Sequence, residues 1–537
     1  MIMEGDLKGH TPNVLGAYRH FVTSISNLKL LIMDKNKPFL LILLLFLVSC
    51  GGMTKEIPAT STSLNEEAPI YPDYRDITIP CNIAPLNVMV ESHGEAFAAA
   101  ITSPSGKQII AAADKNKLFF DETEWHDLLE TEKGNDLKVT IYVKRAGVWN
   151  AFNPYALSVA PEPIDSFLSY RLIEPSFELY RQLGLYQRNL TNFEEYPIYE
   201  NNNTFSAEDN HCINCHNYQN FDATNMLFHV RASHGGTIMV EDGEAKKLKM
   251  TVDSVLGNSV YPSWHPELPL IAFSSNQTGQ VFHLTDLSKI EVVDYASDLV
   301  LYDVENNTLS NVLRTKDYLE TFPHWSPDGK RLFFCRAHTP QLAAVPDSVR
   351  SDKVITLIDS LHYDVMSMEF DPETRIFGEP VLEVACATQQ RSAAVPRVSP
   401  DGRYVLYTEG NRGQFHIWHP EADLFVKDLQ SDSIRCLKNA SASGPDSYHT
   451  WSSNGRWIVV ASRRDDGSYS RAYIAYFDAD GNDHKAFVLP QYDPEHNFCR
   501  MKSYNVPELT RNAVKTTPVQ LREVVYDDES TQQVEYK

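Results

Sequence analysis

Five consecutive residues, Cys212-Ile213-Asn214-Cys215-His216, have the types and the spacing that most directly specify a chemistry in this chain. In such a C-x-x-C-H segment each cysteine can add to a vinyl group of a haem, and the adjacent histidine can bind the iron as its proximal ligand. The spacing therefore predicts one covalently attached haem c, held by Cys212 and Cys215 with His216 on the iron.

Two other chemistries could use the same residues. A zinc site could combine Cys212, Cys215 and His216 with His211, but structural zinc needs four closed ligands and no second C-x-x-C or H-x-x-x-H is present to complete them. A redox-active pair of thiols is also conceivable, although the surrounding sequence lacks a thioredoxin-like strand, turn and helix. Both alternatives stay open beside the haem.

The ligand on the far side of the iron would separate an electron carrier from an enzyme, because electron transfer favours two protein ligands and peroxidase chemistry needs an open position. The nearest candidates are His229 and Met226, followed by His234 and Met239. If 226–230 is a strand, His229 and Met226 point to opposite faces, so only one of them can be the ligand. We favour His229, since an imidazole among apolar neighbours needs a partner.

Residues 33–50 predict export from the cytoplasm. Two lysines precede an apolar run, and the run ends in Leu47-Val48-Ser49-Cys50, which resembles a bacterial lipobox. We expect residues 1–49 to be a leader and lipoprotein signal peptide, Cys50 to be lipidated, and 50–69 to form a flexible tether. A retained signal anchor is the alternative. The predicted location is the bacterial cell envelope, lipid-anchored and periplasm-facing or associated with the outer membrane.

Charge and cysteine content limit the possible partners. The whole chain has a formal net charge of −23, and without residues 1–49 it keeps 43 basic and 68 acidic residues. Nucleic acid is therefore not an expected partner, because it rewards a basic face. The remaining cysteines are scattered and form no disulfide framework. Cys335, within an apolar run, is expected to be a small buried hydrophobic residue.

Four segments in the second half of the chain repeat one pattern. Each ends in a turn and leads into an apolar run, and the anchor residues Trp264, Trp325, Val398 and Trp451 lie 61, 73 and 53 residues apart. In Ser326-Pro327-Asp328-Gly329 the residue types suit a type I turn between two antiparallel strands. A single four-stranded sheet cannot bury both faces, so such repeats must pack around an axis.

These W-S-P-D-G repeats resemble the TolB-type, WD-like β-propeller family over about 226–500. The resemblance implies a mainly β fold with a propeller of five to six blades. Short β-like runs predict a small β-sandwich-like domain at 70–165. We expect a haem-bearing segment of helix and loop at 166–225 and a C-terminal tail at 501–537. Histidines His265, His324 and His449 lie at the repeat turns, but their offsets from the anchors differ, so we do not expect them to converge.

The motif, the lipobox and the propeller together are similar to haem-bearing propeller lipoproteins of bacterial envelopes, notably of Bacteroides-like organisms. That resemblance implies electron transfer or haem-dependent binding. Of these we favour a membrane-tethered monohaem c-type cytochrome that transfers single electrons to a redox or envelope protein partner. One alternative is a TolB-like interaction protein with a structural or sensory haem, and another is a haem peroxidase-like enzyme. No G-x-S-x-G, H-E-x-x-H or phosphate-binding glycine loop is present, so no catalytic residue is named and a carrier or binding protein is favoured over a catalyst.

Overall fold

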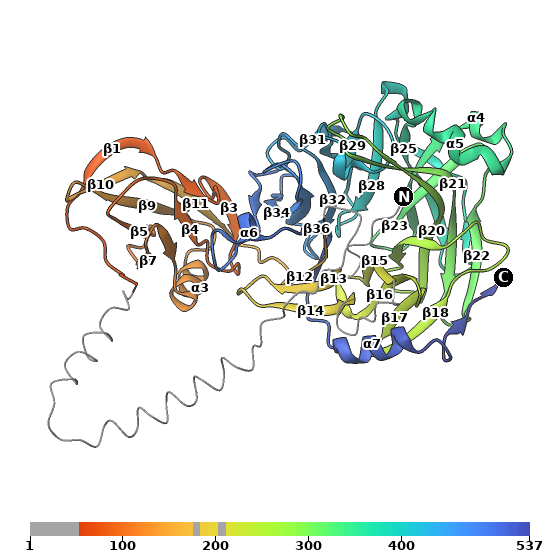
Figure 1. Ribbon diagram of the computed structural model, residues 1–537, viewed down its shortest axis with the longest axis horizontal. Helices are drawn as coiled ribbons and strands as arrows, with labels where there is room; N and C mark the ends of the chain where they lie inside the picture. Colours follow the sequence, from red (N-terminus) through yellow and green to blue (C-terminus); the bar gives the residue numbers. More distant parts are fainter. Residues whose placement is uncertain (1–52, 175–182, 202–210) are drawn as a thin grey trace, which may run out of the picture. The chain divides into compact units, whose positions relative to one another are not determined.

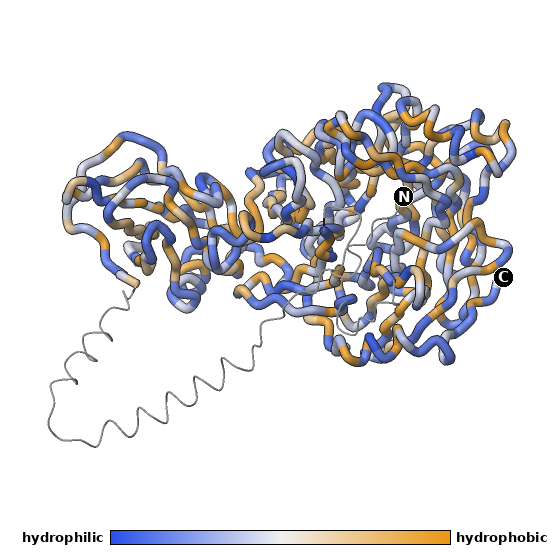
Figure 2. The backbone as a smooth tube through the Cα atoms, viewed as in Figure 1, coloured by the Kyte–Doolittle hydropathy of each residue, from blue (hydrophilic) through white to orange (hydrophobic). Residues whose placement is uncertain are grey.

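The computed structural model describes residues 53–174, 183–201 and 211–537. The described chain is mainly β, and apolar residues are concentrated along its strands while the connecting loops are more hydrophilic (Figure 2). The five α-helices among the described residues are short. They are α3 (Glu122–Thr131), α4 (Pro340–Ala343), α5 (Arg350–Ile355), α6 (His496–Cys499) and α7 (Pro518–Tyr526).

The first domain consists of two sheets and the helix α3. One sheet has seven strands and the other has four. The seven strands are β1 (Thr62–Glu67), β3 (Ile77–Pro80), β5 (Ala96–Thr102), β6 (Gln108–Ile110), β9 (Asp136–Arg145), β10 (Val148–Asn153) and β11 (Tyr155–Ala160). The four strands are β2 (Ile70–Tyr71), β4 (Val88–Val90), β7 (Ala112–Asp114) and β8 (Lys117–Phe119).

Six further sheets, each of four or five strands, follow one another along the chain (Figure 1). The strands named next pair antiparallel within their sheets. The strands are β12 (Phe167–Ile173), β13 (Gly184–Asn189), β14 (Glu195–Glu200); β15 (His211–Gln219), β16 (Asp222–Ala232), β17 (Gly236–Glu241), β18 (Glu244–Lys249); β19 (Ser259–Trp264), β20 (Leu270–Phe282), β21 (Ile290–Asp303), β22 (Thr308–Leu313); β23 (Tyr318–Trp325), β24 (Arg331–His338), β25 (Tyr363–Asp371), β26 (Ile376–Phe377), β27 (Val381–Val384); β28 (Ser392–Val398), β29 (Tyr404–Gly410), β30 (Asp423–Asp428), β31 (Ile434–Cys436); β32 (Asp446–Trp451), β33 (Trp457–Ser462), β34 (Arg471–Tyr476), β35 (Phe487–Val488); and β36 (Ser503–Thr510).

The six sheets close into a ring. β36, from near the C-terminus, pairs with β12, so one sheet has the order β14-β13-β12-β36 and joins the two ends of the ring. The inner strands contact one another in the cyclic order β36, β15, β19, β23, β28, β32. This is the arrangement of a β-propeller, in which each sheet buries its faces against its neighbours. Two short strands, β37 (Gln532–Gln533) and β38 (Glu535–Tyr536), add in parallel to the outer edges of the sheets that begin at β15 and β19.

The ring begins earlier and ends later than the sequence indicated. We expected it to span 226–500, with helix and loop at 166–225, but Phe167–Ile173 is strand β12 and the haem motif lies inside strand β15. The β36 strand likewise comes from the expected tail at 501–537. The strands β12, β15 and β36 lack the Trp and the Pro-Asp-Gly turn that mark the other repeats. Their sequences, which contain tyrosines and polar residues, therefore did not indicate that they belong to the ring.

The repeat turns and anchors have the predicted structure. The amide of Gly329 donates to the Ser326 carbonyl at 2.9 Å, and Gly329 has a φ of +66°, which closes the turn between β23 and β24. The anchors Trp264, Trp325 and Trp451 are buried, as is Cys335. The prediction that tryptophan packs into the interior and that Cys335 is a core residue is therefore confirmed.

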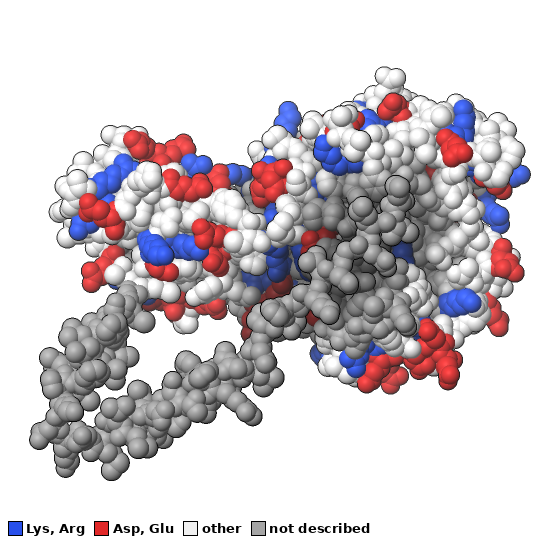
Figure 3. Space-filling view, viewed as in Figure 1, with Lys and Arg blue, Asp and Glu red and all other residues white. Residues whose placement is uncertain are grey.

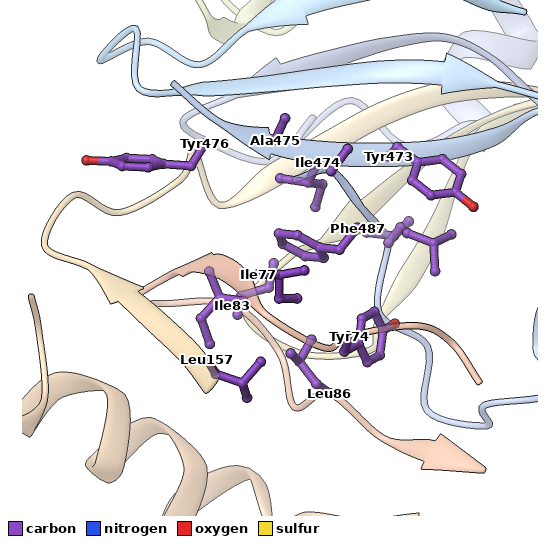
Figure 4. Packing of buried hydrophobic residues seen from close by; sticks show 14 of the residues in the cluster. Tyr74, Ile77, Ile83, Leu86, Leu157, Tyr473, Ile474, Ala475, Tyr476 and Phe487 are labelled. Carbon is purple, nitrogen blue, oxygen red and sulfur yellow. The ribbon is translucent and has the colours of Figure 1, made fainter. Parts of the chain in front are cut away.

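One continuous core links the first domain to the last sheet of the ring. Ile77 and Leu157 of the first domain belong to the same buried cluster as Ile474 and Phe487 (Figure 4). Polar contacts reinforce this packing: the hydroxyl and the backbone N–H of Ser453, in the turn after β32, both donate to the Asp165 carboxylate. On the face shown in Figure 3, acidic and basic side chains are interspersed and no large basic patch appears.

Candidate functional site

The motif lies on β15, the innermost strand of its sheet. β15 pairs with β16, and the register shifts between Asn214 and His216 because Cys215 is an extra, bulged residue with a φ of +44°. A positive φ is uncommon for a residue other than glycine, and a β-bulge of this kind turns a side chain away from the normal alternation. The second cysteine of the motif is thus placed by a local distortion of the strand.

All six inner strands carry the same bulge. Each contains one non-glycine residue with a φ between +44° and +55°, next to a register shift. We call these residues the bulge ring: Cys215, Tyr261, Phe322, Val395, Tyr448 and Val506. Cys215 and His216 therefore occupy positions that hold Tyr-Pro, Phe-Pro, Val-Pro, Tyr-His and Val-Pro in the other sheets.

The bulge ring separates two cavities. A cavity of about 450 Å³, here called the outer cavity, is lined by Arg171, Cys212, Asn214 and residues of the long β20–β21 hairpin. A second cavity of about 360 Å³, here called the chamber, is lined by residues that follow the bulges. Cys215, Tyr261, Tyr448 and Val506 line both cavities, so the bulge ring forms the boundary between them.

The two thiols face the same cavity. Cys212 and Cys215 both line the outer cavity, are half-buried, and are not joined in a disulfide. Burial raises the pKa of the Cys212 thiol, so this cysteine is protonated near neutral pH. Arg171 of β12 fixes the strand between them by donating to the Ile213 carbonyl at 3.0 Å and to Asn214.

The imidazole of His216 faces the chamber. It is buried, and neither ring nitrogen forms a hydrogen bond with the described residues; the Nε2 atom lies 3.9 Å from Oε2 of Glu508. Burial, helped by the positive charge of Arg171, lowers the pKa of His216 to about 3. The ring is therefore neutral at physiological pH, and a nitrogen lone pair is available to a ligand.

The predicted distal ligands lie away from both cavities. His229 is in β16, its Nδ1 atom is 2.8 Å from the Thr237 hydroxyl, and its ring packs against Phe273. Met226 is buried with Ile213 in the core on the opposite face of the strand, as the alternation predicts. Neither residue lines the cavity that holds the thiols or the chamber that holds His216.

The remaining histidines are divided between structure and site. His211 is buried beside Tyr199, with 2.9 Å between its Nε2 and the phenol oxygen. His265 hydrogen-bonds the Gly329 carbonyl, whereas His324 and His449 line the chamber with His216. Two of the turn histidines do therefore approach the same space, although within the described ranges no group of three or more His, Cys, Asp or Glu residues could hold a metal ion.

Sequence reasoning missed several chamber residues. Glu508 accepts hydrogen bonds from the Asn217 side chain at 2.8 Å and the Tyr218 backbone at 3.2 Å, and Arg397 also lines the chamber. Burial raises the pKa of Glu508 to about 7. A sequence alignment that matches the residue before the proline or histidine of each repeat, and that includes Cys215 and Val506, would have placed Arg397 and Glu508 at equivalent positions.

The residue types at this site are those that a c-type haem uses, but the structure divides them between the two cavities. The motif supplies two free thiols in one cavity and, on the adjacent residue, a buried neutral imidazole with an unpartnered Nε2. Cys215 lines both cavities, so it lies between Cys212 in the outer cavity and His216 in the chamber. A buried imidazole without a hydrogen bond is costly unless a ligand satisfies it.

Comparison with known proteins gives structural likeness without a family. No family model matches the chain, and no curated protein matches it. Among solved structures, TolB from Acinetobacter baumannii covers 72% of this chain and 84% of its own, at 12% identity and a TM-score of 0.40. Prolyl oligopeptidase B from Galerina marginata covers 74% and 54% at 10% identity and 0.34, and a DUF4784 family protein from Bacteroides caccae covers 79% and 97% at 8% identity and 0.24. The propeller assignment rests on strand order and inner-strand contacts.

The predicted lipidation residue, Cys50, lies outside the described residues. In the part of the chain that the structure describes, no helix has the length and apolar character needed to cross a membrane.

Proposed function

We propose that this protein is a membrane-tethered monohaem c-type cytochrome of the bacterial envelope, with haem c bound through Cys212 and Cys215 and with His216 as the proximal ligand. The observation that carries the proposal is the neutral, buried imidazole of His216, unpartnered at Nε2 and adjacent to a thiol. A haem bound in this way supplies a one-electron redox centre. A redox or envelope protein is the proposed partner, and we infer six propeller blades from the six inner strands.

The surrounding side chains would keep these donors in place. Arg171 bonds the backbone between the cysteines and reaches Asn505 of β36 at 2.7 Å, so it ties β15 to the closing strand of the ring. Glu508 holds Asn217 and Tyr218, the residues that follow His216. Both contacts join β15 to the sheet that contains both ends of the ring.

A second candidate function follows from the positions of His229 and Met226. His229 contacts Thr237 through Nδ1 but has no hydrogen-bond partner at Nε2 among the described residues, whereas Met226 packs in a core. Neither side chain lines either cavity. A haem site without either ligand would keep a coordination position for a small molecule, as a sensory haem or a peroxidase-like enzyme requires. The spin state of the ferric protein separates this candidate from an electron carrier: a low-spin spectrum supports the carrier, and a high-spin spectrum that shifts on cyanide addition supports the open site.

The cofactor proposal is tested by expressing the full chain in a host with periplasmic haem attachment and staining the denatured protein for haem. We expect a stained wild-type band, no stain after Cys212→Ala with Cys215→Ala, and normal staining after Cys436→Ser, which changes a half-buried thiol elsewhere. An unstained wild-type band, or stoichiometric zinc in place of iron, would overturn the proposal.

The envelope location depends on Cys50. The lipobox-like sequence supports a mature chain that begins at lipidated Cys50. Replacing Cys50 by Ser should move the protein from the membrane fraction to the soluble fraction. Membrane retention of that variant would point to the apolar run at 39–48 as the anchor.

A further inference from the structure

Arg397 departs from the repeated hydrogen bonding of the inner strands. In four of the six strands, the side chain two residues after the bulge bonds the backbone of the next inner strand: Asn217 to Trp264, Ser263 to Trp325, His324 to Val398 and Glu508 to Tyr218. Thr450 bonds its own strand at the Trp451 carbonyl. The equivalent residue of β28 is Arg397, whose guanidinium can only donate.

The guanidinium of Arg397 is held inside the chamber with little to bind. Its one hydrogen bond with the described residues goes from Nη1 to the carbonyl of the adjacent Pro396, at 3.0 Å. No carboxylate among the described residues lies within 4.0 Å of it, and the acidic side chain that shares the chamber, Glu508, already accepts two hydrogen bonds. Most of the fork of donors on this half-buried Arg397 therefore lacks an acceptor among the described residues and is available to a ligand in the chamber.

The rest of the chamber is suited to a small molecule with an apolar body. Its volume of about 360 Å³ is at the small end of the range for ligand pockets. The rings of Tyr261 and Phe322, 4.4 Å apart between centroids, lie at the bulge-ring end, and Trp264, Trp325 and Trp451 line the walls. The exposed residue Arg511 also lines the chamber, so this space is open to solvent at the turn end.

We propose that the chamber binds a small organic carboxylate, with the Arg397 guanidinium as its anchor and the aromatic walls around its apolar part. Arginine presents a planar fork that matches the two oxygens of a carboxylate. The site lies on the far side of the bulge ring from the two thiols, but His216 lines it as well, so a haem bound to that imidazole would compete for the chamber. The inference is therefore tested on haem-free protein.

The test measures, by calorimetry, the binding of benzoate to the full-length protein expressed without haem attachment. Benzamide is its neutral counterpart, and inorganic phosphate is an anion without an apolar body. We expect benzoate to bind and benzamide and phosphate to bind at least tenfold more weakly. Binding of benzamide as tight as that of benzoate, tighter binding of phosphate, or no benzoate binding would overturn the inference.

Variants locate the site. Arg397→Gln should weaken benzoate at least tenfold, Arg397→Lys should retain part of the affinity, and Arg403→Gln, which breaks an ion pair with Asp428 in the same sheet, should leave it unchanged. Because Arg397→Gln removes a half-buried charge that has no ion pair among the described residues and introduces a group that can accept, we expect its thermal midpoint not to fall. Unchanged benzoate affinity in Arg397→Gln would overturn the assignment of Arg397 as the carboxylate anchor. If glutamine disrupts the fold, the benzoate affinity of a folded Arg397→Lys variant is compared with that of the unsubstituted protein instead.

The same titration with the Cys212→Ala, Cys215→Ala variant separates this inference from the proposed function. Benzoate binding by that variant supports the chamber whether or not the wild type carries haem. Loss of haem staining therefore tests the proposed haem attachment. Loss of benzoate binding in both proteins refutes the proposed carboxylate site in the chamber.

Discussion

Two histidines at equivalent positions in β15 and β32 have different surroundings. His216 and His449 each follow a bulge-ring residue, where the other four inner strands have proline, and both are buried with the pKa lowered to about 3. His449 is fully bonded: Nδ1 lies 3.3 Å from the Thr408 hydroxyl and Nε2 lies 3.2 Å from the Leu406 carbonyl. His216 forms no hydrogen bond with the described residues.

The difference shows how one backbone feature can serve either packing or chemistry. The bulge in β28 interrupts its pairing with β29 between Ala394 and Arg397, and His449 supplies a partner to Leu406 in that region. His216 has the same backbone position and the same burial but no such role. A residue that the fold does not use for its own hydrogen bonds is the better candidate for a ligand contact.

The largest expected effect is the loss of stability when Trp451, the buried anchor at the end of β32, is replaced. Trp451 is buried, packs against Phe477 with 5.1 Å between ring centroids, and donates from Nε1 to the Arg397 carbonyl. Trp451→Ala should lower the free energy of unfolding by about 3–5 kcal/mol. Urea unfolding followed by circular dichroism measures this, with Trp149→Ala, at a half-buried position of β10, as a control that should cost less. Equal losses would show that the anchors do not dominate the stability of the ring.

The two histidines give the direct comparison. His449→Ala removes two hydrogen bonds, leaves the Leu406 carbonyl unpaired and opens a cavity, so we expect a loss of about 2–4 kcal/mol. His216→Ala, which breaks no hydrogen bond within the described chain, should cost about 1–2 kcal/mol from lost packing. The comparison fails if the unfolding free energies of the two variants agree, or if His216→Ala is the less stable.

The sequence indicated the regular part of the molecule better than its site. Trp325, with its Ser-Pro-Asp-Gly turn, predicts a strand pair and a buried anchor because those residue types have strong local preferences. β15 and β36 lack these marks, and what defines them, a bulge at Cys215 and at Val506, comes from the geometry of the ring. The cysteines and His216 could be named from their spacing, whereas the two separate cavities and Arg397 depend on contacts between distant strands.

Acid should reveal the buried state of His449. Its pKa in the folded protein, about 3, lies below the value near 6.5 of an unfolded chain, so between these pH values the unfolded state binds more protons. The stabilising contribution is present above pH 6.5 and is lost as the pH falls toward 3, by about 1.4 kcal/mol per pH unit. His449→Gln should flatten the loss of stability from pH 6.5 to 4 by up to that slope. Parallel pH profiles for wild type and variant would mean that His449 titrates normally in the folded protein.

The smallest effect concerns the turns that follow the two strands. After β32 the turn uses Gly455 at a φ of +68°, whereas after β15 the positive φ angles fall on Asn220 and Phe221, at +46° and +60°. Glycine adopts this conformation without the steric cost that a side chain brings, although asparagine tolerates it better than most residues. Asn220 and Phe221 both line the chamber, but Asn220 is exposed, so Asn220→Gly relieves the backbone while the larger Phe221 side chain stays in place. We expect the unfolding free energy to rise by about 0.5 kcal/mol, measured by urea unfolding, while Gly455→Ala lowers it by about 1 kcal/mol. A loss of stability in Asn220→Gly would indicate that the asparagine side chain, rather than the backbone shape alone, holds the turn beside the motif.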